Sequence, residues 1–523
     1  MKLVCTSALK RVFDEKDCKT VFSGKCLQNE SFAFQVFVGA EEEIVNAPVS
    51  VKSKIKANVY EVKKMKGDLY AENMDDYFER VADDMYPELL QTAKALNVRK
   101  GENATLFVEI PADEKKAGVH TLQVSVGEST VEFTLEVLRK KLVPTDMLVT
   151  HWFHMDGIAD SYGVKPFSKA FYKLFESFLS AYVKMGNTMI LVPLFTPPLD
   201  TEYSRERTTA QLVGVTKKNG RYRFEFSKLK EYMDVCRKYG IKYFELSHLY
   251  SQWGGRYCPK VMVKEGGKLV NAFGWNKSSE STEYKRFLRA FLPKLCAFLR
   301  REGVFDDCVM HLTDEPNENH IQRYCRLSKF VRRLNQGMRL FDALSEYAFY
   351  QTGAVDLPVV CTASKDIPLF ENAKKLVYYC VGVDKNYLSN RYFHMPLHRT
   401  VILGVQLYEQ GVYGFLHWGY NFYNACLSRK KINPYENTTA DGGFFAGDSF
   451  IVYPGKDGVE YSLRYFALLK AFEDYRLLKT VESKKGKAEV MQILQEEGIS
   501  GWHEYPRSLD AYEGLRERLY QAL

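Results

Sequence analysis

An adjacent pair of carboxylic acids is the feature of this sequence most suggestive of chemistry. Asp314 and Glu315 follow an apolar segment directly, in HLTDEP, and Pro316 ends that segment. Acid–base catalysis needs one carboxyl that gives a proton and one that stays ionised. Adjacent residues of a strand point to opposite sides, so both reach one site only if the chain turns there. The alternative is structural, with Asp314 capping the next turn and Glu315 facing solvent.

The elements around this pair favour the catalytic interpretation. From Pro144 onward, short apolar runs alternate with helices of 3.6-residue periodicity, which is typical of parallel strands joined by helical crossovers. Eight β/α units are the number of a TIM-type (β/α)8 barrel, whose active sites lie at the carboxyl ends of the strands. Asp314 and Glu315 follow the fourth run. The predicted strands are Leu148–Phe153, Thr188–Leu194, Ile241–His248, Cys308–Thr313, Leu340–Ser345, Leu357–Thr362, Leu376–Val381 and Tyr413–Trp418.

The chain before the barrel has a different pattern. Apolar and polar residues alternate with period two over much of the first 145 residues, which indicates an antiparallel β-sandwich. Amphipathic periodicity predicts helices over 168–185, 282–301 and 319–335 and a helical tail from about 459. We therefore expect an α/β protein with a β-sandwich domain at 1–145, a catalytic barrel at 146–480 and a helical appendage at 481–523.

Further polar and aromatic residues follow the predicted strands, where a barrel places its ligands. Aromatic side chains make up 14% of the sequence, and their flat faces suit the apolar faces of sugars. For each of these residues, the alternative to ligand binding is a packing role at the rim of the barrel. The candidate binding residues are His154, Asp156, His248, Trp253, Tyr379, Trp418, Tyr420 and Asn421.

Composition excludes several classes of function. The formal net charge is +8 and no basic run occurs, so we expect no nucleic-acid partner. The eleven cysteines are scattered with no CxxC spacing, which predicts no metal site and no cofactor. No segment reaches the roughly 18 apolar residues of a membrane span, and the N-terminus lacks a signal-peptide core. We therefore predict a cytoplasmic protein without a membrane partner; its oligomeric state stays open.

Seven segments, in order along nearly the whole chain, resemble glycoside hydrolase family 123 and the related proteins catalogued as domain of unknown function 4091. They are HWFHMDGIADSYGV, LVPLFTPPLDT, YFELSHLYSQWG, HLTDEP, DALSEYAFY, GVQLYEQGVYGFLHWGYNFYN and INPYENTTADGGFFAGDSFIVYPG. The resemblance implies a β-sandwich before a TIM-type barrel. It also implies hydrolysis of β-linked N-acetylgalactosamine with retention of configuration, assisted by the substrate's own acetamido group.

The same resemblance implies roles for individual residues. Glu315 would protonate the glycosidic oxygen and later deprotonate water, while Asp314 would accept the acetamido N–H. These two roles are what the resemblance implies; for the other candidates we expect roles from residue type and position alone. Trp253, Tyr379 and Trp418 would form an apolar floor. Tyr420 and Asn421 would contact the acetamido group, and His154, Asp156 and His248 would bind sugar hydroxyls.

Three other functions remain open at the level of sequence. A conventional retaining glycosidase would use Glu346 or Asp342 as its nucleophile. A metal-dependent hydrolase would bind its ion through His151, His154, His248 and Asp314, although the spacing HWFH places its two histidines on opposite strand faces. A carbohydrate-binding protein would keep the aromatic cleft without catalysis. The galacto or gluco preference and the leaving group are not determined by the sequence.

Overall fold

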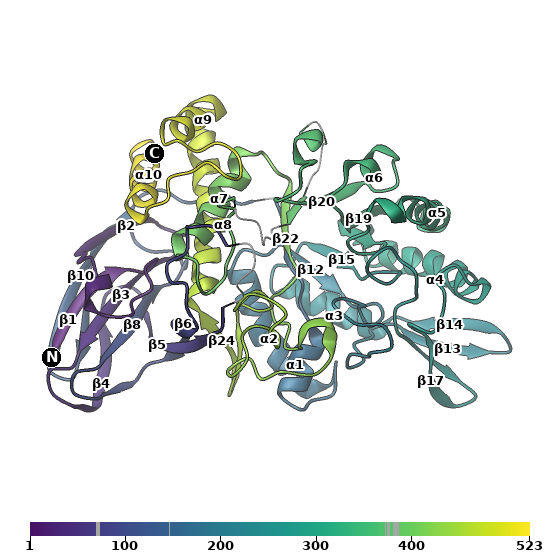
Figure 1. Ribbon diagram of the computed structural model, residues 1–523, viewed down its shortest axis with the longest axis horizontal. Coiled ribbons are helices and arrows are strands. Elements are labelled where there is room, and N and C mark those ends of the chain that lie inside the picture. The colour runs from purple at the N-terminus through teal and green to yellow at the C-terminus, as the bar shows by residue number, and fades with distance from the viewer. Residues whose placement is uncertain (70–73, 146, 372, 374–376, 380–385) are drawn as a thin grey trace.

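The computed structural model of the protein describes residues 1–69, 74–145, 147–371, 373, 377–379 and 386–523. Figure 1 shows a sheet-rich N-terminal region at one side, a parallel sheet with its helices in the centre, and a helical C-terminal tail above the N-terminal region. This mixed α/β arrangement with a helical tail confirms the coarse fold expected from sequence.

Two sheets that enclose an apolar core form the N-terminal region. One has the order β1-β3-β8-β5-β6-β24-β23 and the other the order β2-β10-β9-β4-β7. Their shared core includes Phe34 and Val36 from one sheet and Leu122 and Phe133 from the other. The strands are β1 (Lys2–Ser7), β2 (Ser23–Leu27), β3 (Phe32–Gly39), β4 (Ile44–Lys52), β5 (Asn58–Gly67), β6 (Asp84–Thr92), β7 (Ala95–Val98), β8 (Asn103–Ile110), β9 (Gly118–Val126), β10 (Ser129–Leu138), β23 (Tyr453–Gly455) and β24 (Gly458–Ser462).

Two features of this region differ from the simple sandwich predicted. Strands β2 and β10 pair in parallel, which their long separation in sequence permits because no hairpin fixes their directions. The hairpin of β23 and β24 comes from the C-terminal part of the chain, and β24 pairs antiparallel with β6. The sequence patterns of the first 145 residues contain no information about strands that later parts of the chain add to the sheet. The predicted domain limits stay a prediction.

Eight parallel strands form the central sheet, and each lies within or overlaps one of the eight predicted runs. The hydrogen-bonded order is β11-β22-β21-β20-β19-β18-β15-β12. The ladder is not closed between β11 and β12, so the predicted closed barrel is not shown by the strand pairing. The strands are β11 (Leu148–His151), β12 (Met189–Val192), β15 (Tyr243–Leu246), β18 (Cys308–His311), β19 (Arg339–Ala343), β20 (Leu357–Cys361), β21 (Val377–Tyr379) and β22 (Gly414–His417).

Helices connect these strands, and several begin where a serine can cap them. The Ser168 and Ser281 side chains accept hydrogen bonds from the amides of Phe171 and Tyr284, at the first turns of α2 and α4. The predicted helices at 168–185, 282–301 and 319–335 are confirmed as α2, α4 and α5. The helices are α1 (Met155–Ser161), α2 (Lys169–Lys184), α3 (Ser227–Lys238), α4 (Thr282–Arg301), α5 (Ile321–Arg332), α6 (Tyr347–Gln351) and α7 (Leu397–Glu409).

A small four-stranded sheet, which the sequence patterns do not predict, interrupts the β/α units. Its order is β14-β13-β16-β17, and its two hairpins follow β12 and β15 (Figure 1). The strands are β13 (Gly214–Lys218), β14 (Arg221–Glu225), β16 (Val261–Glu265) and β17 (Lys268–Phe273). Their many lysine, arginine and glutamate residues mask the alternation that identifies a strand.

The C-terminal tail joins the two regions of the protein. It consists of α8 (Leu463–Lys485), α9 (Lys487–Glu496) and α10 (Leu509–Gln521). The buried Arg464 of α8 pairs with Glu88 of β6 at 2.7 Å, which ties the tail to the N-terminal sheet. Within the described part of the chain, no helix combines the length and apolarity needed to cross a membrane.

Candidate active site

The chain turns sharply at Glu315, directly after β18. Glu315 has a φ of +42°, its amide donates to the Ala343 carbonyl at 2.9 Å, and its side chain is exposed. Asp314 is only 6% exposed, and its carbonyl accepts the Trp253 amide at 2.7 Å. The turn that the catalytic interpretation of the pair required is therefore present.

The surroundings of Asp314 are unfavourable for its charge. Burial raises its pKa well above the usual value, and the negative charges of neighbouring carboxylates raise it further. Its Oδ1 atom is buried and has no hydrogen-bond partner among the described residues. A buried carboxylate oxygen without a donor is costly, so it marks a place where a ligand donor fits. The carboxylates that act on Asp314 are Glu315, Asp342, Glu245 and Asp200.

A buried ionic network lies beside this pair. Glu245 of β15 accepts hydrogen bonds from Trp152 Nε1 at 2.6 Å and Thr150 Oγ1 at 2.9 Å. The imidazole Nε2 of His311, on β18, also bonds to Glu245. Burial opposes a charge on His311, but the charges of Glu245 and Asp342 outweigh it and raise the pKa of His311 to about 9. His311 is therefore an imidazolium at neutral pH.

His248 is the predicted binding residue nearest to this network. Its ring stacks on that of His311 with centroids 4.0 Å apart. Burial, together with the His311 charge, lowers the pKa of His248 well below its usual value. Neither ring nitrogen has a partner among the described residues, so both are available to a ligand or a water.

His154 and Asp156 are occupied by a third residue, Arg207. The Arg207 guanidinium donates from Nε and Nη2 to Asp156 at 2.7 and 2.6 Å, and Nη2 lies 2.9 Å from His154 Nδ1. The other ring nitrogen of His154 bonds to the Trp418 carbonyl at 2.8 Å. Burial and the Arg207 charge lower the pKa of His154 to about 3. These contacts leave neither side chain free for a sugar hydroxyl.

Tyr420 and Asn421 also use their polar groups within the protein. The Tyr420 hydroxyl donates to the Phe178 carbonyl at 2.9 Å, and the Asn421 amide exchanges two hydrogen bonds with the His154 backbone. Both side chains are fully buried. The Asn421 contacts tie the loop after β22 to the loop after β11, and the Tyr420 contact ties it to α2. Both sets of contacts count against the predicted contact with an acetamido group.

The three aromatic residues predicted as an apolar floor differ in accessibility. Trp253 is 44% exposed and follows β15 in a left-handed conformation, with a φ of +55°. Trp418 is mostly buried against Phe422 and Phe444. Tyr379 belongs to β21, but its side chain lies outside the described residues. Trp253 is thus the best placed of the three for stacking with a ligand.

Asp200 is a candidate that the sequence analysis missed. Its amide donates to Gln252 Oε1 at 2.6 Å, and its Oδ2 accepts the Leu427 amide at 2.9 Å, so three loops meet at this residue. Burial raises its pKa to about 6, and the charge of Glu315 adds to the increase. The signal in the sequence was its position in the segment LVPLFTPPLDT, after the second strand.

The proposed metal ligands do not come together. Among the described residues, no group of three or more His, Cys, Asp or Glu side chains is arranged to hold a metal ion. His151 Nδ1 bonds to Asn187 at 2.8 Å, and both nitrogens of His154 are engaged. The metal-dependent alternative therefore lacks support in the geometry.

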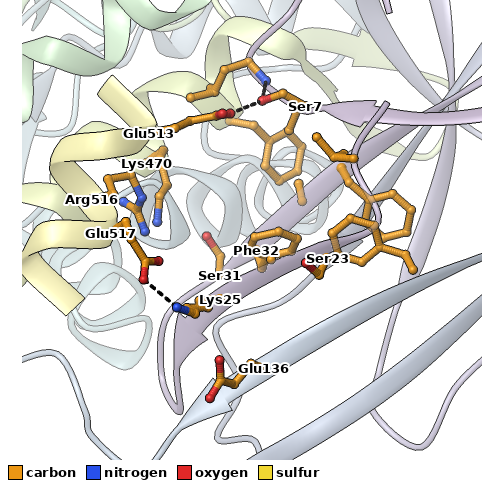
Figure 2. Close-up of a pocket in the computed structure, with 18 of the residues that line it drawn as sticks. Ser7, Ser23, Lys25, Ser31, Phe32, Glu136, Lys470, Glu513, Arg516 and Glu517 are labelled. Carbon is orange, nitrogen blue, oxygen red and sulfur yellow. Dashed lines mark hydrogen bonds and ion pairs between the residues drawn. The ribbon is translucent and has the colours of Figure 1, made fainter. Parts of the chain in front are cut away.

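Cavities of different sizes lie away from the carboxylate pair. A cavity of about 230 Å³ is lined by residues that follow Asp200, including Thr201, Tyr203 and Arg207, and by Trp275. A second cavity of about 570 Å³ lies between the N-terminal sheets and the tail, as Figure 2 shows. Hydrogen bonds from Ser7 to Glu513 and from Lys25 to Glu517 link strands β1 and β2 to α10 at this cavity. It shares no lining residue with the Asp314–Glu315 site.

Comparisons with known proteins agree with this arrangement. Residues 152–481 match the family model of the glycoside hydrolase 123 catalytic domain. A family 123 glycoside hydrolase from Clostridium perfringens, whose structure was analysed for glycolipid glycan hydrolysis, is 14% identical, with a TM-score of 0.73 over 100% of this chain and 97% of its own. A family 5 mannosidase from Rhizomucor miehei, also 14% identical, covers 68% of this chain and 96% of its own with a TM-score of only 0.33.

A search of curated proteins finds no match. The structural likeness to the Clostridium perfringens enzyme shows the fold alone, because the identity is low. The family model, in contrast, spans more than half of the sequence and includes β18 and the Asp314–Glu315 pair that follows it. The chain therefore belongs to glycoside hydrolase family 123, and its substrate is a carbohydrate.

Proposed function

We propose that the protein is a retaining exo-glycosidase that removes terminal β-linked N-acetylgalactosamine with the help of the substrate's acetamido group. One observation carries the proposal. A buried carboxylate with an unpartnered oxygen, Asp314, directly precedes an exposed carboxylate, Glu315, at a turn after β18. The buried group suits a donor on the substrate, and the exposed group suits exchange of protons with the leaving group and with water.

In the first step Glu315 gives its proton to the glycosidic oxygen as the bond from that oxygen to C1 breaks. The carbonyl oxygen of the 2-acetamido group attacks C1 from the opposite face and forms a five-membered oxazolinium ring. Asp314 accepts the acetamido N–H and balances the positive charge that develops on the ring. In the second step Glu315 removes a proton from water, the water oxygen bonds to C1, and the ring opens. Two inversions give net retention.

The local environment of Asp314 supports this role. Its raised pKa means that its ionised form is poorly stabilised in the free protein. A positive group that arrives beside it therefore stabilises this carboxylate more than it would stabilise an ordinary surface carboxylate. That gain is largest near the transition state, when the oxazolinium charge has formed, and stabilisation confined to the transition state accelerates turnover.

A conventional nucleophile has less support. Such a carboxylate would lie about 5–5.5 Å from the acid/base and contact C1 directly. Asp342 is 0% exposed, and its Oδ2 accepts hydrogen bonds from the amide and hydroxyl of Thr313, which hold this carboxylate inside the sheet. Glu346 is half-buried, and burial raises its pKa. It remains the alternative nucleophile.

We also propose that the eight parallel strands close into a TIM-type barrel. Their order is the cyclic order of such a barrel with a single break, between β11 and β12. The Thr188 amide, just before β12, donates to the Val149 carbonyl of β11 at 3.0 Å, and the Val149 amide donates to Thr188 Oγ1 at 3.0 Å. Both bonds cross the break.

The substrate would be a glycan or glycoconjugate with a terminal N-acetylhexosamine. Exposed Trp253, whose amide binds the Asp314 carbonyl, supplies an aromatic face beside the reacting group. The work on the Clostridium perfringens relative concerns glycolipid glycans, and a glycolipid is accordingly the first natural substrate to test.

A panel of nitrophenyl β-glycosides with and without the 2-acetamido group tests the proposal. We expect hydrolysis of the N-acetylgalactosaminide, inhibition by a thiazoline analogue of N-acetylgalactosamine, and no turnover of the β-galactoside. Covalent trapping of a 2-fluoro sugar on Glu346 would establish the conventional mechanism instead. Binding of the sugar without turnover of any glycoside would make the protein a carbohydrate-binding protein.

A further inference from the structure

Three ionisable side chains are completely buried on three neighbouring strands of the central sheet. Glu245 lies on β15, His311 on β18 and Asp342 on β19, and all are 0% exposed. Burying an ionisable group costs several kcal/mol unless it is paired, and well-packed apolar residues are often at least as stable as a buried ion pair. The stability of the sheet therefore does not account for this triad.

Contacts within the triad join it into one unit. His311 Nε2 bonds to Glu245, and His311 Nδ1 lies 3.7 Å from Asp342 Oδ1. The imidazolium of His311 thus stands between two carboxylates. Glu245 is held in turn by Trp152 and Thr150 from the β11 side of the sheet.

Contacts from β19 reach the residues on both sides of Asp314. Asp342 Oδ2 accepts the Thr313 amide at 2.9 Å and the Thr313 hydroxyl at 3.2 Å. The next carbonyl of the same strand, that of Ala343, accepts the Glu315 amide at 2.9 Å. A left-handed conformation such as that of Glu315 is strained for a residue with a side chain, so it needs such fixed neighbours.

The triad also belongs to the electrostatic surroundings of Asp314. The charged groups that act on Asp314 are Glu315 beside it, Asp342 and Glu245 of the triad, and Asp200 from the loop after β12. The imidazolium of His311 stands between the two triad carboxylates and offsets one of their two charges. Without His311, Asp314 would face both of them uncompensated.

We propose that Glu245, His311 and Asp342 are positioning residues that hold the turn carrying Asp314 and Glu315 and set the balance of charge around Asp314. The inference rests on the proposed catalytic roles of those two acids. This role does not require any of the three side chains to touch the substrate. They act through Thr313, through the β19 backbone and through the electric field at Asp314.

Two substitutions separate the two parts of this role. Asp342→Asn removes one negative charge near Asp314 and keeps an oxygen that accepts the Thr313 amide. The acidic limb of the kcat profile should then move to lower pH, by about half a unit or more, because Asp314 ionises more readily. Thr313→Val removes the hydroxyl bond to Asp342 and keeps every charge. It should lower kcat about 10-fold, the equivalent of roughly one hydrogen bond, with little change in KM and no shift of the acidic limb.

Asp356→Asn is the matched control. Asp356, just before β20, also accepts a backbone amide, that of Leu340 near the start of β19, at 2.7 Å. Asp356→Asn should lower the melting temperature without moving the pH profile of kcat. If Asp342→Asn leaves the acidic limb in place, or moves it to higher pH, the electrostatic part of the proposal is wrong. If Thr313→Val retains full kcat, the positioning part is wrong.

A measurement without substrate keeps this inference separate from the proposed function. Ionised Asp314 destabilises the fold, so Asp314→Asn should raise the melting temperature at pH 8 more than at pH 4. That difference should shrink when Asp342 is Asn, because the pKa of Asp314 is then raised less. If the gain in melting temperature from Asp314→Asn depends on pH equally with and without Asp342→Asn, the triad does not act on Asp314. This conclusion holds even if the protein hydrolyses the glycoside. If the pH dependence does become smaller but the protein does not hydrolyse the glycoside, only the proposed function is wrong.

Discussion

The imidazole rings of His248 and His311 lie face to face, 4.0 Å apart and inclined by 17°, yet only one of them carries a charge. Two carboxylates hold His311 as an imidazolium, whereas His248 has no such partner and its charge is opposed by burial and by His311 itself. The pair therefore places a neutral imidazole, whose two nitrogens have no partner in the described part of the chain, against a fixed cation next to the candidate active site.

His248→Phe tests whether those nitrogens serve a ligand. Phenylalanine keeps the stacked ring and removes two buried polar atoms without partners, so the free energy of unfolding should fall by less than 1 kcal/mol or rise. If the nitrogens bind sugar hydroxyls, KM for the glycoside should increase about 10-fold, the equivalent of one hydrogen bond. An unchanged KM in a stable variant would assign His248 to packing alone.

Glu315→Gln tests the proton donor. Glutamine cannot protonate the leaving oxygen, so turnover of a natural glycoside should fall by roughly 10²–10⁴, while a nitrophenyl glycoside should lose less because its leaving group needs little protonation. Glu318→Gln is the control, since Glu318 is an exposed carboxylate on the same loop. Equal losses on the two substrates would show that Glu315 only binds.

Asp314→Asn tests the charge beside the acetamido group. Asparagine keeps the shape and a carbonyl acceptor but loses the negative charge, so kcat should fall markedly and KM change little. The melting temperature at pH 7 should stay the same or rise, because the native environment disfavours ionised Asp314. Wild-type turnover in a folded variant would contradict substrate assistance as proposed.

The cluster of His154, Asp156 and Arg207 predicts a dependence of stability on acid. The folded-state pKa of His154, about 3, lies below the unfolded value, so the stability that neutral His154 contributes is present above pH 6.5 and is lost as the pH falls from 6.5 towards 3. His154→Gln should flatten the fall of melting temperature across that window. His503→Gln, an exposed control, should not.

Arg207→Met tests the same cluster at neutral pH. The substitution leaves Asp156 buried without its bidentate partner, and the free energy of unfolding should fall by about 3–5 kcal/mol. Urea denaturation measures the change. A loss below about 1 kcal/mol would show that water replaces the guanidinium, and it would reopen Asp156 as a ligand-binding group.

The sequence by itself determined the strands of the central sheet and the position of the Asp314–Glu315 pair after the fourth of them. Short apolar runs followed by amphipathic helices leave local signals, and all eight runs contain or overlap strands of the central sheet. Local signals also place Asp314 and Glu315 at a strand end, because Pro316 terminates the run. The helical tail is equally local, since its periodicity depends on nearby residues alone.

Only the tertiary structure decided which polar residues are free to bind a ligand. His154 and Asp156 have the residue types of a binding site, but Arg207, some fifty positions away in sequence, occupies both. His311 lies within an apolar run, and its charge depends on Glu245 and Asp342 on the two neighbouring strands. Such pairings depend on which strands are neighbours. Neighbours in a parallel sheet are separated by entire helices in the sequence, so no local pattern reports them.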